Sequence, residues 1–198
     1  MNPLRNLIHR LQRYNQIASI GEIARRYFAM NAFDGVLTII GVLMGSYTAG
    51  VEEARIVIST GMATSVAMGI SGLWGAYLTE AAERKRSLTE LEGYTLTDLN
   101  DTSLGEASRA AVVIVALVDG LSPFLAALVV LTPFFFPQFF PNPRWIYITA
   151  IGLALLALFG LGVFLGRISR RNILGYGLRT IVAGIISIVI SLLLGSSP

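Results

Sequence analysis

Residues 110–131 read AAVVIVALVDGLSPFLAALVVL, and Asp119 is the single charged residue in this run of 22. A helix needs about 20 mostly apolar residues to cross the hydrocarbon core of a membrane, so the run predicts a spanning helix. An acid inside a membrane is costly and, as a rule, is kept because it binds or relays something. The same stretch therefore indicates both a fold and a candidate site.

The composition of the whole chain points to an integral membrane protein. Of its 198 residues, 54% are hydrophobic and 14% are charged, whereas soluble domains carry about 25% charged residues. The mean hydropathy is +0.68. We expect an all-α membrane protein whose five transmembrane helices lie at about 29–51, 55–79, 109–133, 145–166 and 176–195.

The basic residues predict how the chain is oriented. Thirteen of the fifteen lysines and arginines fall in the N-terminal arm and in the second and fourth loops, and the other two are Arg55 and Arg144. Basic loops stay in the cytoplasm, which places the N-terminus inside and the C-terminus outside. Because these charges flank apolar runs, we expect a lipid bilayer as partner and no nucleic acid.

The N-terminal region, residues 1–28, is predicted to be an amphipathic helix on the cytoplasmic surface. Leu4, Leu7 and Ile8 recur at helical spacing between arginines, although a solvated basic arm is an alternative. The region lacks the apolar core of a signal peptide, which weakly favours a prokaryotic plasma membrane. Residues 29–198 form the transmembrane domain in this prediction, with an acidic cytoplasmic segment at 80–108.

The residue types present limit the chemistry. The chain has no cysteine and a single histidine, His9, so thiolate and histidine-rich metal sites are excluded. No nucleophile lies beside a candidate base, so no enzyme and no tightly bound cofactor are expected.

A second acid, Asp34, lies in an apolar run, at the cytoplasmic end of the first predicted span. It belongs to residues 31–38, NAFDGVLT. Its neighbours along one helix face are Met30, Asn31 and Thr38, which we predict to line a transport path.

Around Asp119 the sequence offers further ligands. Ser122 follows at i+3, Pro123 removes the amide that would bind the Asp119 carbonyl, and Met68 is predicted at a similar depth. Oxygen ligands with one thioether suit a divalent cation, and a cation that binds a carboxyl group displaces its proton. The alternative is that either aspartate merely bonds a neighbouring helix.

The loop and the glycines allow two interpretations each. Glu80 and Glu83, three residues apart in the acidic segment, could share a cation or could simply be solvated. The Gly41-x-x-x-Gly45 and Gly162-x-x-x-Gly166 patterns favour close helix packing, either within one chain or between two copies.

Two stretches resemble the vacuolar iron transporter family. Residues 33–38, FDGVLT, followed by Gly41, are similar to its first-span signature, and residues 68–84, MGISGLWGAYLTEAAER, are similar to its second span. The resemblance implies a homodimer that exports Fe²⁺ or Mn²⁺ in exchange for protons, with Asp34 as the pore carboxylate and cytoplasmic acids that collect metal.

The chain departs from that family at three points. Gly72 stands in place of a methionine, Ala76 stands in place of an acid, and the cytoplasmic segment is short for a three-helix metal-binding domain. We therefore expect Asp119 and Met68 to supply ligands from other positions. A channel or carrier for another small solute, or a membrane anchor or assembly protein without transport, are the alternatives.

Overall fold

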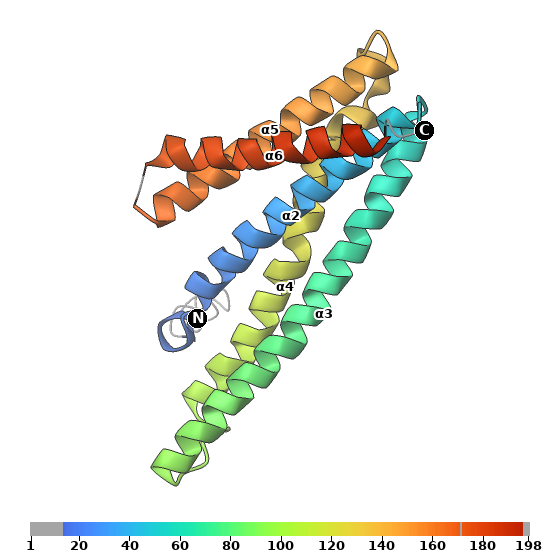
Figure 1. The fold of residues 1–198 in the computed structure, drawn as a ribbon. Coiled ribbons are helices and arrows are strands. Elements are labelled where there is room, and N and C mark those ends of the chain that lie inside the picture. Colours follow the sequence, from blue (N-terminus) through green and yellow to red (C-terminus); the bar gives the residue numbers. More distant parts are fainter. Residues whose placement is uncertain (1–13, 171, 196–198) are drawn as a thin grey trace, which may run out of the picture. The chain divides into compact units, whose positions relative to one another are not determined.

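The computed structural model describes residues 14–170 and 172–195, and every regular element within them is helical. Five helices are long and apolar enough to cross a membrane, as predicted. The side of the membrane on which each terminus lies stays a prediction. The long helices are α2 (Ile20–Thr48), α3 (Ala54–Thr95), α4 (Ser103–Leu131), α5 (Pro143–Ile168) and α6 (Ile173–Gly195) (Figure 1). Two short 3₁₀ helices, η1 (Thr132–Phe135) and η2 (Pro137–Phe139), lie between α4 and α5.

The chain divides into two compact units, which are described separately below. The first unit comprises Ile70–Leu121 and the described part of Met1–Phe28. The second comprises Ala29–Gly69 and the described part of Ser122–Pro198.

The helix that contains most of the first predicted span, 29–51, begins at Ile20. Residues 14–18 are helical, Ser19 has a positive φ of 49°, and α2 then starts at Ile20. The Ser19 carbonyl accepts hydrogen bonds from the amides of Glu22 and Ile23, at 3.1 and 3.2 Å, which starts the new helix. The boundary expected at residue 28 thus falls inside α2, and residues 1–13 of the expected amphipathic helix lie outside the described residues.

The second spanning helix is much longer than a bilayer requires. α3 has 42 residues, or about 63 Å at 1.5 Å per residue, against a hydrocarbon core of about 30 Å. Its last part carries the charged residues from Glu80 onward. The expected continuation of this helix into the charged segment is confirmed, and its position beyond the membrane stays a prediction.

In the second unit, α5 and α6 pack side by side through glycine (Figure 1). A Cβ atom at Gly162 would lie 2.7 Å from the Gly177 Cα, and one at Gly166 would lie 2.8 Å from the Ile173 Cα. The Thr180 hydroxyl donates a hydrogen bond of 2.8 Å to the Leu158 carbonyl. The Gly162-x-x-x-Gly166 pattern therefore serves packing within one chain.

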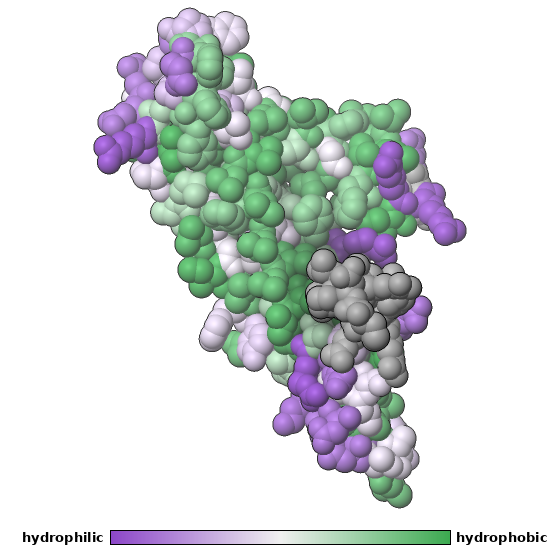
Figure 2. All heavy atoms as spheres, turned by 180° about the vertical axis from the view of Figure 1, so that it is seen from behind, coloured by the Kyte–Doolittle hydropathy of each residue, from purple (hydrophilic) through white to green (hydrophobic). Residues whose placement is uncertain are grey.

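The connection between α4 and α5 folds back onto the core of the second unit. Phe134 is buried, and its ring meets that of Tyr147 edge to face at 5.0 Å. The Asn142 side chain caps α5 by accepting a hydrogen bond from the Trp145 amide. On the face shown in Figure 2, hydrophobic side chains cover much of the visible surface and hydrophilic ones form separate clusters.

Candidate functional site

Asp119 is buried in the first unit although it lies in an apolar helix. Its exposed fraction is 6%. A Cβ atom at Gly72 of α3 would lie 3.0 Å from Asp119 Oδ2 and 3.2 Å from its carbonyl oxygen. Because Gly72 has no side chain, α3 leaves room for this carboxyl group. Sequence reasoning noted Gly72 as a departure from the family but missed its contact with Asp119.

The first unit also holds polar groups on α2 and α3 that interact with one another. The Tyr27 hydroxyl donates a hydrogen bond of 3.3 Å to Glu80 Oε1, and Arg84 Nε lies 3.2 Å from Glu80 Oε2. The charge of Asp119 also acts on the Tyr27 phenol. Tyr27 was not among the predicted site residues, and a lone tyrosine after two arginines gives no sequence signal for such a role.

Asp34 has the opposite environment, on the outer surface of α2 in the second unit. The neighbouring Gly35 faces inward, where a Cβ atom would lie 2.6 Å from the backbone of Pro123. Successive helix residues point about 100° apart, so this contact turns Asp34 outward, and its side chain is exposed. Among the described residues, none forms a hydrogen bond with the Asp34 carboxylate.

The helix face that carries Asp34 continues through small residues. Thr38, Gly41 and Gly45 follow it at intervals of three or four, which places them along the same face. A Cβ atom at Gly41 or Gly45 would meet no described atom within 4 Å. This face, which we call the open α2 face, comprises Asp34, Thr38, Gly41 and Gly45. Of the other predicted path residues on this helix, Met30 is exposed and Asn31 is partly buried.

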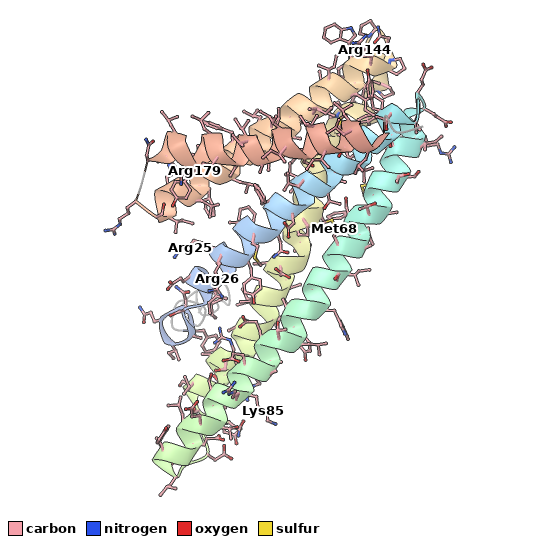
Figure 3. All side chains as sticks on the ribbon, in the orientation of Figure 1. Arg25, Arg26, Met68, Lys85, Arg144 and Arg179 are labelled. Atoms are coloured by element: carbon pink, nitrogen blue, oxygen red, sulfur yellow. The ribbon has the colours of Figure 1, made fainter. Side chains whose placement is uncertain are left out.

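The remaining predicted ligands lie in different parts of the fold. Met68 is partly buried on α3 and belongs, like Asp34, to the second unit (Figure 3). Ser122, which is 3% exposed, follows Asp119 on α4 but belongs to the second unit. Pro123 lies inside this helix, so the Asp119 carbonyl lacks its usual amide donor, as expected. That Met68 joins Asp119 in one coordination set stays a prediction.

Several acids of the 80–108 segment have structural partners. Glu92 Oε1 accepts hydrogen bonds from the Leu99 amide and the Asn100 side chain, at 2.9 and 3.1 Å. Asp98 Oδ1 accepts two from Asn100, both 2.8 Å, and these bonds lower the pKa of this exposed carboxyl group. Glu80 is held by Arg84, whereas Glu83 is exposed.

No three acidic or histidine side chains gather into a metal-binding group anywhere in residues 14–170 or 172–195. A cation at Asp34 or Asp119 would therefore need further oxygen ligands from hydroxyls, carbonyls, water or a second copy of the chain.

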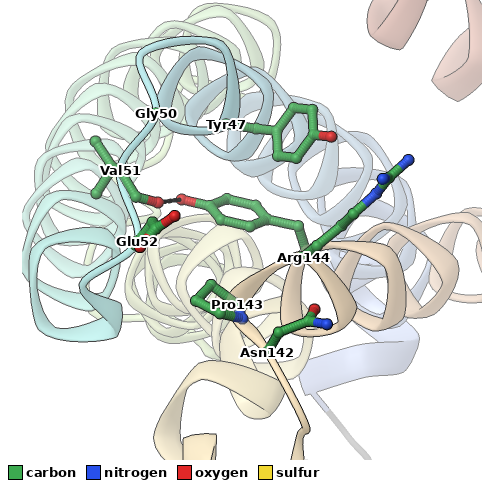
Figure 4. A pocket seen from close by; sticks show the side chains of 8 residues that line it. Tyr47, Gly50, Val51, Glu52, Asn142, Pro143 and Arg144 are labelled. Atoms are coloured by element: carbon green, nitrogen blue, oxygen red, sulfur yellow. Dashed lines mark hydrogen bonds between the residues drawn. The ribbon is translucent and has the colours of Figure 1, made fainter.

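A cavity of about 320 Å³ lies within the second unit, where the α2–α3 turn meets the start of α5 (Figure 4). Tyr147 is one of its lining residues, and the Tyr147 hydroxyl donates a hydrogen bond of 2.7 Å to the Val51 carbonyl. Glu52 and Arg144 give its lining one charge of each sign. The sequence did not indicate this cavity, because its residues come from two loops that are far apart in the chain.

Five apolar helices, one of which carries the buried Asp119, define an integral membrane protein. Residues 95–196 match the model of the VIT family. The chain belongs to this family, and thereby to the membrane transporters of metal ions. It is also 30% identical over 177 residues to an uncharacterized protein of the archaeon Methanocaldococcus jannaschii, with 86% of this chain and 87% of that protein covered.

Proposed function

We propose that this protein moves Fe²⁺ or Mn²⁺ out of the cytoplasm in exchange for protons. The observation that carries the proposal is the Asp119 carboxyl group, buried against Gly72 inside an otherwise apolar span. An acid inside an apolar span is, as a rule, kept because it binds or relays something. Membership of a metal transporter family favours a metal ion as what Asp119 binds.

In this proposal Asp34 and Asp119 are both metal ligands. Asp34 would serve as an entry ligand, as expected from its place near the start of the first predicted span, and Thr38 continues its helix face. Ser122, Met68, Asn31 and Met30 would complete the path. Glu80 and Glu83 would attract metal on the cytoplasmic side, with Glu83 the more accessible because Glu80 is paired with Arg84.

Proton exchange follows from the chemistry of a carboxyl ligand. A metal ion and a proton compete for the same oxygens, so metal entry releases a proton and metal departure allows one to return. No additional redox group or resident cofactor is needed for this cycle.

We further propose that the transporter is a homodimer in a prokaryotic plasma membrane, with its N-terminus in the cytoplasm. The open α2 face supports a dimer, since small residues let helices of two copies approach closely in lipid. A second copy would also bring a second Asp34 toward the first. The archaeal relative is compatible with a prokaryotic membrane.

The proposal is tested with protein reconstituted into liposomes that contain a metal-sensitive dye and a pH-sensitive dye. Asp34→Asn and Asp119→Asn should each reduce Fe²⁺ and Mn²⁺ flux to that of empty liposomes and should abolish the coupled pH change. Asp101→Asn is the matched control, because it neutralises an exposed acid outside the spans. Normal flux in both intramembrane variants would contradict the site assignment.

A binding measurement separates a transporter from a membrane anchor. A metal present at 100 times its dissociation constant stabilises the folded state by about 2.7 kcal/mol. Thermal unfolding against Mn²⁺, Fe²⁺, Mg²⁺ and Na⁺ should show this stabilisation for the transported metals alone, and Asp119→Asn should remove it. An unfolding temperature that no cation changes would favour the anchor.

A further inference from the structure

A second cavity, of about 410 Å³, lies in the first unit between α3 and α4. On α3 its lining residues recur one helical turn apart, and on α4 they do the same, so the cavity is a groove along two adjoining helix faces. Asn100 of the α3–α4 loop also lines the groove. The lining consists of Tyr77, Ala81, Arg84, Lys85 and Leu88 from α3, Asn100 from the loop, and Gly105, Ser108, Arg109, Val112 and Val113 from α4.

The charged residues of this lining are all basic. Arg84 shares its charge with Glu80, at 3.2 Å. Neither Lys85 nor Arg109 forms an ion pair with any residue that the structure describes. Arg109 uses one guanidinium nitrogen to donate a hydrogen bond of 3.0 Å to the Asn100 carbonyl, which fixes the side chain and leaves its other donors available. The groove thus presents two positive charges that have no ion-pair partner among the described residues.

The rest of the lining is apolar. Leu88 and Val112 are buried, and Val113 and Tyr77 remain 51% and 43% exposed. The hydroxyl of Ser108 and the side chain of Asn100 add polar groups beside the basic residues. A ligand that fits this lining carries negative charge at one end and an apolar part at the other.

The groove lies at the boundary between the apolar and the charged parts of its helices. On α3 the last apolar residues of the span, which include Tyr77, give way to charged residues from Glu80 onward. On α4 the apolar run begins directly after Arg109. Lysine and arginine at such a boundary reach the depth of lipid phosphates, and basic pockets between spanning helices bind lipid headgroups.

We propose that this groove binds an anionic phospholipid, with its phosphate between Lys85 and Arg109 and its acyl region along Val112 and Val113. Lys85 acts as a mobile point charge, whereas Arg109 offers a planar set of donors that suits phosphate oxygens. This site is separate from the intramembrane acids and does not depend on the proposed metal transport.

The site is tested by lipid titration of the purified full-length protein in a neutral detergent, with thermal unfolding as the readout. Phosphatidylglycerol should raise the unfolding temperature in a saturable way, and phosphatidylcholine should do so far less. Lys85→Gln with Arg109→Gln should weaken the apparent affinity for phosphatidylglycerol on the order of tenfold, given the contribution of each basic residue near lipid phosphates.

The matched control is Arg25→Gln with Arg86→Gln. It removes two exposed positive charges that do not line the groove, and Arg86 directly follows Lys85 in the sequence of α3. This pair should bind the lipid as the unmodified protein does. If both double variants lost the same affinity for phosphatidylglycerol, general surface charge would explain the binding, and the proposed site would be overturned.

Two further arms make the result decisive. Lys85→Gln alone removes an exposed side chain without an ion pair, so it should fold normally and still weaken lipid binding. Inorganic phosphate and glycerol phosphate should not stabilise the protein at the concentrations at which the lipid does. Stabilisation by the free phosphates at those concentrations would show that the acyl region is unnecessary and would overturn the lipid assignment.

Discussion

Asp119 and Asp34 are both acids within spanning helices, and their surroundings are opposite. Asp119 is 6% exposed and lies against the backbone of Gly72. Asp34 is exposed, and the glycines that follow it along the open α2 face have no neighbour within 4 Å at the Cβ position. The first acid is enclosed by its own chain, whereas the second lies where lipid or a second copy must complete its environment.

The difference shows that glycine has two uses in one membrane protein. At Gly72 the missing side chain makes room for a functional group from another helix. On the open α2 face the missing side chains leave a smooth surface for an external partner. A glycine pattern in the sequence does not distinguish these uses, because it does not say what lies opposite.

The largest expected effect concerns the enclosed acid. Gly72→Leu would force its side chain into Asp119, so we expect a loss of about 1–3 kcal/mol in unfolding free energy and a strong loss of metal flux. Gly75→Leu on the same helix is the control, since a Cβ atom there meets no described atom within 4 Å. Detergent unfolding titrations and liposome flux measure the two effects. If both variants had the same unfolding free energy and the same metal flux, the contact between Gly72 and Asp119 would not matter for function.

A smaller effect is expected on the open α2 face. Gly41→Leu should change the unfolding free energy of a single chain by less than about 0.5 kcal/mol, because no described atom is close. It should weaken self-association in liposomes on the order of tenfold if two copies meet along this face. Energy transfer between labelled copies measures this, and Gly152→Leu, at another open glycine, is the control. Unchanged association would place any dimer interface elsewhere.

The smallest effect concerns Asp98, an exposed acid that, unlike Asp34, has hydrogen-bond partners. The Asn100 amide and side chain lower the pKa of Asp98 in the folded protein. Its stabilising effect is therefore full above its ordinary pKa of about 4 and is lost as the pH falls through the lower folded value. After correction for the intrinsic exchange rate at each pH, the Asn100 amide should exchange its hydrogen faster at acidic pH. Asp98→Ala should show the faster exchange already at neutral pH.

Much of the fold could be predicted from sequence, because length and hydropathy alone decide whether a helix can cross a membrane. All five spans were anticipated, and so was the extension of the second span through Glu80. Charges such as Arg25 suggested a surface segment before the first span. In the structure these charges belong to the same helix as the span, because α2 begins at Ile20.

The candidate site was harder to predict, because its contacts join residues far apart in the chain. The enclosure of Asp119 depends on Gly72, and the partner of Tyr27 is Glu80. The acids of the 80–108 segment looked alike in the sequence, yet Glu92 and Asp98 serve to hold the loop. The spacing of acids in the sequence does not show which of them accept hydrogen bonds from backbone amides and which do not.

The length of α3 has a mechanical consequence. Its residues run without a proline from Gly72, beside Asp119, to Thr95 at the start of the α3–α4 loop, a distance of about 35 Å at 1.5 Å per residue. An uninterrupted helix of this kind is a stiff rod, so a small tilt or twist imposed on its far end moves the other end as well. The exposed end of α3 is thus a lever arm through which an event in the aqueous phase can adjust the space around a carboxyl group in the membrane.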